Sequence, residues 1–170
     1  MGLPDRRDAG NCAAMRTLLF ALFALLTSPA LAQGWDHYDN ARFGYGIDIP
    51  PDFVANGLSD NGDGQVFQEM RKARALAVWG GQLMDDFETA VTADMGYARQ
   101  EGWTIAEQTI TPRWASFGAV KGSRMVRQRM ILLCDGVSYA AFRAEFSASD
   151  VTNMVPIVER LAQSLKGGSC

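Results

Sequence analysis

Apolar and polar residues alternate along several segments of the chain, which is the pattern of half-buried β-strands. The clearest case runs from Phe43 to Ile49, where every second residue is aromatic or isoleucine and the residues between are glycine or aspartate. The pair Pro50-Pro51 predicts the end of this strand, because proline cannot donate a backbone hydrogen bond to a sheet. We expect further strands in four β-rich runs, at residues 65–70, 74–79, 103–110 and 114–120.

The pair Asp135-Gly136 separates two long β-rich runs and predicts a tight hairpin turn. A two-residue turn at this place requires a positive φ angle at both central residues, which glycine adopts readily. The turn also fixes the register of the two strands. The expected partners are Arg129 with Phe142, Ile131 with Ala140 and Cys134 with Val137.

Two segments carry apolar residues at helical spacing. The first begins at Asp85, which we expect to cap the helix together with Glu88, and ends at Gly102. The second covers residues 151–165 and contains Pro156, which suits a helix only in its first turn. Strands outnumber helices, and most of them follow one another directly. The pattern therefore predicts a single α+β domain, a largely antiparallel sheet with two main helices packed on it.

The N-terminal region has the three parts of a secretory signal. The uncharged run LLFALFALL at residues 18–26 follows Arg16 and precedes the small-residue segment Ala30-Leu31-Ala32. We expect a signal peptide that is cut after Ala32. The apolar region is shorter than the roughly 20 residues of a membrane-spanning helix, so we expect no stable membrane anchor after cleavage.

This signal divides the chain into three parts. Residues 1–14 form an expected extension ahead of a true start at Met15, residues 15–32 the signal peptide, and residues 33–170 one exported domain. The exported domain keeps 13 basic and 17 acidic residues, a net charge of −4. Domains that bind nucleic acid are normally basic, so this balance argues against a nucleic-acid partner.

Two cysteines lie in the expected exported domain, Cys134 and Cys170. An even number of cysteines in an exported chain predicts a disulfide bridge, here between these two residues. The alternative is a buried Cys134 with an unpaired Cys170.

One stretch carries a family resemblance. The opening Tyr38-x-Asn40-x-Arg42-Phe43-Gly44-Tyr45-x-Ile47-x-Ile49-Pro50, the turn Asn61-Gly62-Asp63-Gly64 and the closing helix resemble a group of exported bacterial proteins of unknown function. Their element order is similar to the PsbP-like fold, an α/β/α sandwich with an antiparallel sheet. PsbP-like domains mostly act as accessory or partner-binding proteins, so the resemblance implies a binding role and transfers no functional residue.

Two polar features could carry chemistry. His37 is the only histidine, and we expect it in a mobile segment near the start of the exported domain, which disfavours histidine-based catalysis and multi-histidine zinc sites. Asp60, Asn61 and Asp63 offer calcium-type oxygen ligands on a glycine-rich loop. An EF-hand frame fails there because its twelfth position is Met70, so the sequence favours a polar turn.

Basic residues gather at two places. Arg71, Lys72 and Arg74 lie between two expected strands, and Arg127 and Arg129 share one face of the long hairpin. These five residues form a candidate surface for an anion or an acidic partner. A solvated strand face is the alternative.

The sequence therefore favours a non-catalytic accessory or binding domain, periplasmic or secreted, whose partner is an envelope protein or a small ligand. It predicts no cofactor, no metal and no catalytic residue. The rivals are an envelope hydrolase that uses an Asp/Glu pair and a calcium-dependent structural envelope protein. A deep pocket with two converging carboxylates would favour the hydrolase, and a broad open surface would favour partner binding.

Overall fold

The computed structural model describes residues 34–168. The expected extension, signal peptide and Cys170 lie outside these residues. No helix in the described range is long and apolar enough to cross a membrane. In chain order the elements are β1 (Asp36–Asn40), β2 (Tyr45–Ile49), β3 (Val54–Leu58), β4 (Gly64–Glu69), η1 (Met70–Lys72), β5 (Arg74–Gln82), α2 (Phe87–Gln100), β6 (Thr104–Ile110), β7 (Trp114–Lys121), β8 (Arg124–Leu132), β9 (Ser138–Ser147), η2 (Ala148–Asp150), α3 (Val151–Ser164) and β10 (Lys166–Gly167), where η marks a short 3-10 helix.

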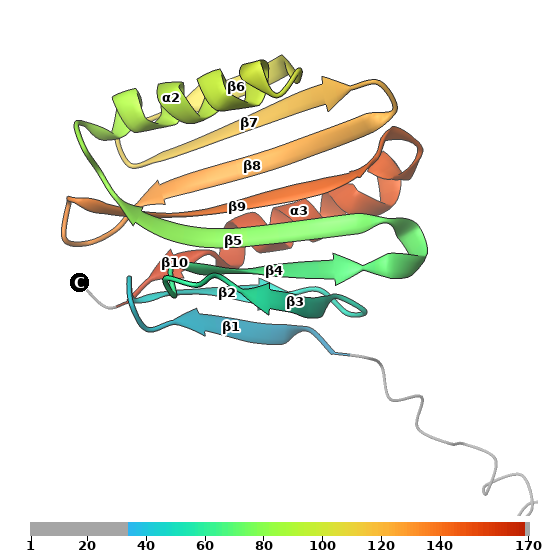
Figure 1. Ribbon diagram of the computed structural model, residues 1–170, viewed down its shortest axis with the longest axis horizontal. Coiled ribbons are helices and arrows are strands. Elements are labelled where there is room, and N and C mark those ends of the chain that lie inside the picture. Colours follow the sequence, from blue (N-terminus) through green and yellow to red (C-terminus); the bar gives the residue numbers. More distant parts are fainter. Residues whose placement is uncertain (1–33, 169–170) are drawn as a thin grey trace, which may run out of the picture. The chain divides into compact units, whose positions relative to one another are not determined.

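The strands form two antiparallel sheets. The larger has seven strands in the order β3-β4-β5-β9-β8-β7-β6, and the smaller has the order β1-β2-β10. Helix α2 packs on one face of the large sheet, and α3 with the small sheet packs on the other (Figure 1). This arrangement confirms the expected α+β domain, with two helices packed on a largely antiparallel sheet.

Helix α2 is held by a buried face and a capping aspartate. Phe87 and Met95 are buried against β7 and β8, and burying such a side chain contributes about 1.5–3 kcal/mol. The cap is Asp86, whose side chain accepts a hydrogen bond from the Thr89 backbone N–H at 2.7 Å. The prediction that Asp85 caps this helix was therefore wrong by one residue.

Helix α3 contains Pro156, as predicted, but not in the first turn, where a proline is best tolerated. Pro156 is the sixth helical residue and so lies in the second turn, not the first. A proline at this position removes one helical hydrogen bond and costs about 3 kcal/mol. Met154 and Leu161 are fully buried in the core between the two sheets, and their burial, worth about 1.5–3 kcal/mol each, offsets this loss.

The β8–β9 hairpin has the predicted register. Arg129 lies opposite Phe142, and Ile131 lies opposite Ala140. Because side chains alternate between the two faces of a strand, Val126 and Met130 of β8 pack under α2. Arg127 and Arg129 therefore face the opposite side of the sheet, the side that carries α3.

The hairpin turn is longer than predicted. The strands stop at Leu132 and Ser138, and of the turn residues only Gly136 has a positive φ angle, 71°. The prediction of a positive φ at both Asp135 and Gly136 was wrong. Instead the Asp135 carboxylate accepts the backbone N–H groups of Val137 and Ser138, at 3.0 and 2.8 Å, and stabilises a wider turn.

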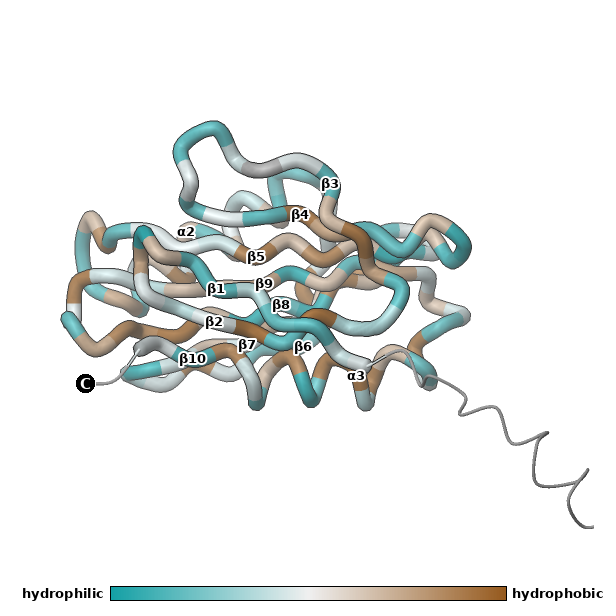
Figure 2. Tube along the Cα trace, turned by 90° about the horizontal axis from the view of Figure 1, so that it is seen from below, coloured by the Kyte–Doolittle hydropathy of each residue, from teal (hydrophilic) through white to brown (hydrophobic). Residues whose placement is uncertain are grey.

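Three strands were not predicted: β1, β3 and the two-residue β10. The sequences of β1 and β3, DHYDN and VANGL, show no alternation, and β3 is largely exposed at one edge of the large sheet. Figure 2 shows the hydrophilic loop that joins β3 to β4 projecting from the rest of the domain. The side chain of Asn40 in β1 donates a hydrogen bond to the Gly62 carbonyl at the base of that loop, at 3.0 Å.

Candidate functional site

The loop with Asp60, Asn61 and Asp63 has its side chains bonded to one another. Asn61 Nδ2 donates to Asp63 Oδ2 at 2.7 Å, and Ser59 Oγ donates to Asn61 Oδ1 at 3.0 Å. Across residues 34–168, no group of three His, Cys, Asp or Glu side chains is placed to hold a metal ion. The loop has the hydrogen bonding of a polar turn.

Cys134 lies just after β8, with its Sγ atom 3.5 Å from the Gly168 carbonyl oxygen. The pairing of β10 with β2 brings the end of the described chain to this place, and the Gly168 N–H donates to the Gly44 carbonyl at 2.7 Å. Cys170 lies outside the described residues, so its bridge to Cys134 stays a prediction.

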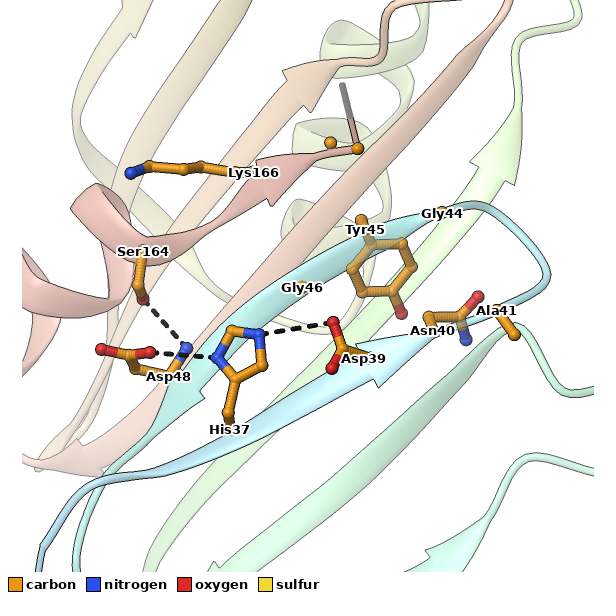
Figure 3. A pocket seen from close by; sticks show the side chains of 12 residues that line it. His37, Asp39, Asn40, Ala41, Gly44, Tyr45, Gly46, Asp48, Ser164 and Lys166 are labelled. Atoms are coloured by element: carbon orange, nitrogen blue, oxygen red, sulfur yellow. Dashed lines mark hydrogen bonds and ion pairs between the residues drawn. The ribbon is translucent and has the colours of Figure 1, made fainter. Parts of the chain in front are cut away.

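The only histidine lies in an open pocket of about 650 Å³ between β1, β2 and the end of α3 (Figure 3). His37 belongs to strand β1, so the expectation of a mobile segment was wrong. Its Nδ1 atom is 3.1 Å from Asp48 Oδ1, and its Nε2 atom is 3.4 Å from Asp39 Oδ1. The ring covers Gly46, where an added Cβ would lie 2.8 Å from Nε2.

The carboxylate of Asp48 is shared between His37 and Arg160. Besides His37, it accepts hydrogen bonds from Nε and an Nη nitrogen of Arg160 in α3, at 3.0 and 2.9 Å. The hydrogen bond with His37, and then the bonds and charge of Arg160, lower the pKa of Asp48 below its ordinary value. This network ties β1 and β2 to α3.

Ser164 also lines the pocket, but its hydroxyl is not hydrogen bonded to His37. Its Oγ accepts the Asp48 backbone N–H at 3.1 Å and donates to the Leu161 carbonyl at 3.2 Å. Nucleophilic catalysis would need the hydroxyl bonded to the imidazole, whereas both ring nitrogens of His37 face carboxylates. The polar residues of the pocket form a structural network that links β1, β2 and α3.

The predicted basic surface is divided by the fold, and Arg74 does not belong to it. Its side chain is 6% exposed, with Nε 2.5 Å from Asp150 Oδ2 and an Nη nitrogen 3.7 Å from Glu69 Oε2. The hydrogen bond from Arg74 lowers the pKa of Asp150. Arg71 and Lys72 are exposed on η1. Arg74 is therefore a buried cation that joins β5 to the start of α3.

Arg127 and Arg129 lie on a part of the large sheet that α3 leaves uncovered. Phe142, opposite Arg129 on β9, is buried in the α3 core, whereas the next residues across the sheet from Arg129 are polar. Ser116 of β7 lies beside Arg129, and Thr109 of β6 lies beside Ser116. The row that starts at Phe142 and ends at Thr109 therefore runs from the part of the sheet that α3 covers to the part that α3 leaves open.

Both arginines lie flat on the open part. Arg127 extends over Gly118, where an added Cβ would collide with its guanidinium, and forms an ion pair with Glu107. Arg129 stacks on Trp114, with its guanidinium carbon 4.4 Å from the ring centroid, and an Nη nitrogen donates to the Ser116 hydroxyl at 3.2 Å.

Arg129 differs from Arg127 in its bonding. Among the described residues, no carboxylate is bonded to Arg129, and its buried Nε atom has no hydrogen-bond partner. Burial lowers the pKa of its guanidinium. We call the surface formed by Trp114, Ser116, Arg127 and Arg129 the Arg129 face. Sequence reasoning found both arginines and missed Trp114, because only the β7–β8 pairing brings it beside Arg129.

The fold can be compared with solved structures. No family model and no curated protein sequence matches the chain. The solution structure of cyanobacterial PsbP (CyanoP) from Synechocystis sp. PCC 6803 matches 82% of this chain and 96% of its own, with 12% identity and a TM-score of 0.61. The fold is PsbP-like. The Ran-binding protein Mog1p of Saccharomyces cerevisiae shares it, at 9% identity and a TM-score of 0.60 over 80% of this chain and 96% of its own.

Proposed function

We propose that this protein is an exported, non-catalytic domain that binds a protein partner of the bacterial envelope, and that the Arg129 face is its binding surface. The observation that carries the proposal is Arg129 itself. Its guanidinium is stacked on a tryptophan on an open sheet face, and among the described residues it has no carboxylate bonded to it and no hydrogen-bond partner for its buried Nε atom. The signal-like N-terminus supports export to the periplasm or beyond.

The chemistry of this face indicates the kind of partner. Guanidinium groups bind carboxylates through paired, charge-assisted hydrogen bonds, which are stronger than neutral ones. Tryptophan and arginine are also the residues most enriched at binding hot spots. A partner that places a carboxylate over Arg129 and an apolar group on Trp114 would satisfy both. A Ran-binding protein with this fold supports a partner-binding role by analogy alone.

The arrangement of carboxylates in the His37 pocket disfavours the alternative function, a hydrolase. The pocket's two carboxylates, Asp39 and Asp48, converge on His37, and Asp48 is also bonded to Arg160. A hydrolytic pair needs one carboxyl group to hold a proton and the other to stay free for water or substrate. Asp48 has its pKa lowered, which disfavours the acid role.

The test is a comparison of capture by matched variants. The protein from residue 33 to 170 is immobilised and incubated with envelope extract, in the wild-type form and as Arg129→Gln and Arg124→Gln. Arg124 is a half-buried arginine paired with Glu145 on the opposite face, so it controls for loss of an ion pair. Thermal melts establish that all three forms are folded.

We expect a protein that the wild type and Arg124→Gln retain equally. Arg129→Gln should retain about tenfold less of this protein, or still less, because a hydrogen bond to a charged group contributes about 1.5–3 kcal/mol. Retention should also fall as salt is raised from about 50 to 500 mM, since the contact is ionic. Equal retention by both variants would refute the assignment of the binding surface to the Arg129 face.

A further inference from the structure

A second open surface lies on the opposite face of the large sheet, where α2 covers only one half. Met130 of β8 is buried beneath α2, whereas Trp79 of β5, two strands away in the same row, is only partly buried at the margin of the core beneath α2. Tyr139 of β9 lies across Gly81, where an added Cβ would meet its ring at 2.7 Å. Trp79 and Tyr139 lie on the same face of the neighbouring strands β5 and β9, and together they form the floor of this surface.

Two hollows adjoin this floor. One, of about 270 Å³, lies between Tyr139 and the side of α2 that carries Asp94 and Tyr97. The other, of about 240 Å³, lies between Trp79 and the β3–β4 hairpin, with Val66 in its lining. In Figure 1 this region is the stretch of β9, β5 and β4 between α2 and β3. We call the floor and its two hollows the Trp79 groove.

The groove exposes apolar side chains to solvent. Tyr97 is 64% exposed and Val66 38%, and Met84, which also lines the groove, is 98% exposed. Large exposed apolar groups gathered on one concave surface are a mark of interaction sites. Because the β-strands beneath are paired and satisfied, the occupant must contact the groove mainly through side chains.

Most of the charges around the groove are negative. Among the described residues that line its two hollows, the ionised groups are the carboxylates of Asp63, Asp85 and Asp94, with no lysine, arginine or histidine. The adjoining first turn of α2 adds Asp86 and Glu88. The Asp94 carboxylate is partly buried, which raises its pKa, and it accepts a hydrogen bond from the neutral side chain of Gln128. Arg143 of β9 acts on Asp94 through its charge but forms its own ion pair with Glu101.

We propose that the Trp79 groove binds a basic segment of a protein partner, in which a lysine or arginine stands beside an aromatic or aliphatic side chain. The cation lies between Asp94 and the aromatic rings of Tyr97 and Tyr139, which attract it through both charge and cation–π contact. The apolar neighbour lies on Trp79. This site is separate from the Arg129 face, which is cationic and lies on the other side of the sheet, and it does not depend on the function proposed for that face.

The test uses a random twelve-residue peptide library displayed on phage and panned against the immobilised protein from residue 33 to 170. Enriched peptides are synthesised, and their dissociation constants are measured for the wild type and four variants. Asp94→Asn keeps the shape of the side chain and its contact with Gln128, and Tyr97→Ser changes an exposed residue, so neither threatens the fold. Glu107→Gln and Arg129→Gln are controls on the opposite face.

We expect enriched peptides to combine lysine or arginine with an aromatic or aliphatic residue. Their dissociation constants should rise about tenfold in Asp94→Asn and Tyr97→Ser and stay within about twofold in both controls. Three results would overturn the proposal: enrichment of acidic or uncharged peptides, equal binding by Asp94→Asn and wild type, or no enrichment at all. Loss of binding in Arg129→Gln would assign the peptides to the other face.

Discussion

Removal of the buried arginine Arg74 should destabilise the domain strongly. Its side chain is 6% exposed, and its two acidic neighbours, Glu69 and Asp150, are 5% and 15% exposed. In Arg74→Ala both carboxylates stay in place without their cation. Breaking a buried ion pair by removing one partner costs about 3–5 kcal/mol, because the charge left behind has lost both water and its partner.

The matched control is Arg124→Ala. Arg124 also forms an arginine–carboxylate pair, with Glu145 at 3.1 Å, but the two side chains are 31% and 34% exposed. Solvent screens such a pair, and its loss should cost about 0–1 kcal/mol. Urea unfolding followed by circular dichroism gives both free energies of unfolding, with the slope against urea unchanged. If Arg74→Ala costs no more than Arg124→Ala, the reasoning on burial is wrong.

The ion-pair cluster of Arg74, Glu69 and Asp150 should also make the stability of the domain depend on pH. The pKa of Asp150 is lowered in the folded protein, first by its hydrogen bond with Arg74. Its contribution is therefore complete above the unfolded pKa, about 3.9, and is lost as the pH falls through the folded value. The difference in stability between wild type and Arg74→Ala should shrink as the pH is lowered from about 6 to 3. A difference that stays constant would contradict this assignment.

Three further predictions concern the turn, the disulfide and the N-terminus. Gly136→Val should lower the free energy of unfolding by about 1 kcal/mol or more, because φ is 71° at this position. Gly96→Ala, which lies in open space on α2, should instead raise the free energy of unfolding by about 0.5–1 kcal/mol. Urea unfolding measures both values, and equal effects of the two substitutions would refute the argument from backbone strain at Gly136. Thiol counting on the unfolded, unreduced protein should find no free thiol if Cys134 and Cys170 are bridged; two thiols would exclude the bridge. Intact mass of the exported protein should place its first residue at Gln33, and a retained apolar segment would contradict export.

The sequence predicted the parts of the fold that alternate or repeat. The β8–β9 register followed from Asp135-Gly136, because a turn fixes every pair along two regular strands. Strands β1 and β3 could not be found, because they lie at sheet edges with few buried side chains and so lack the alternation that burial imposes.

The candidate site was predictable only in part. Arg127 and Arg129 were found because alternate residues of one strand share a face. Arg74 was misassigned because its burial depends on Asp150, which is 76 positions away in the sequence. The Trp79 groove left no local signal, since it forms where helix α2 ends its cover of the sheet.

Site-specific photo-crosslinking in cells that export the protein is the most direct test of whether the Arg129 face binds a partner protein. The photoreactive residue p-benzoylphenylalanine replaces Thr109, which is exposed beside Ser116 on the Arg129 face, or Thr92, which is exposed on helix α2. We expect a crosslinked partner protein from position 109, absent from position 92 and lost when Arg129→Gln is added. No crosslink from position 109, or one that persists in Arg129→Gln, would show that the Arg129 face is not the binding surface.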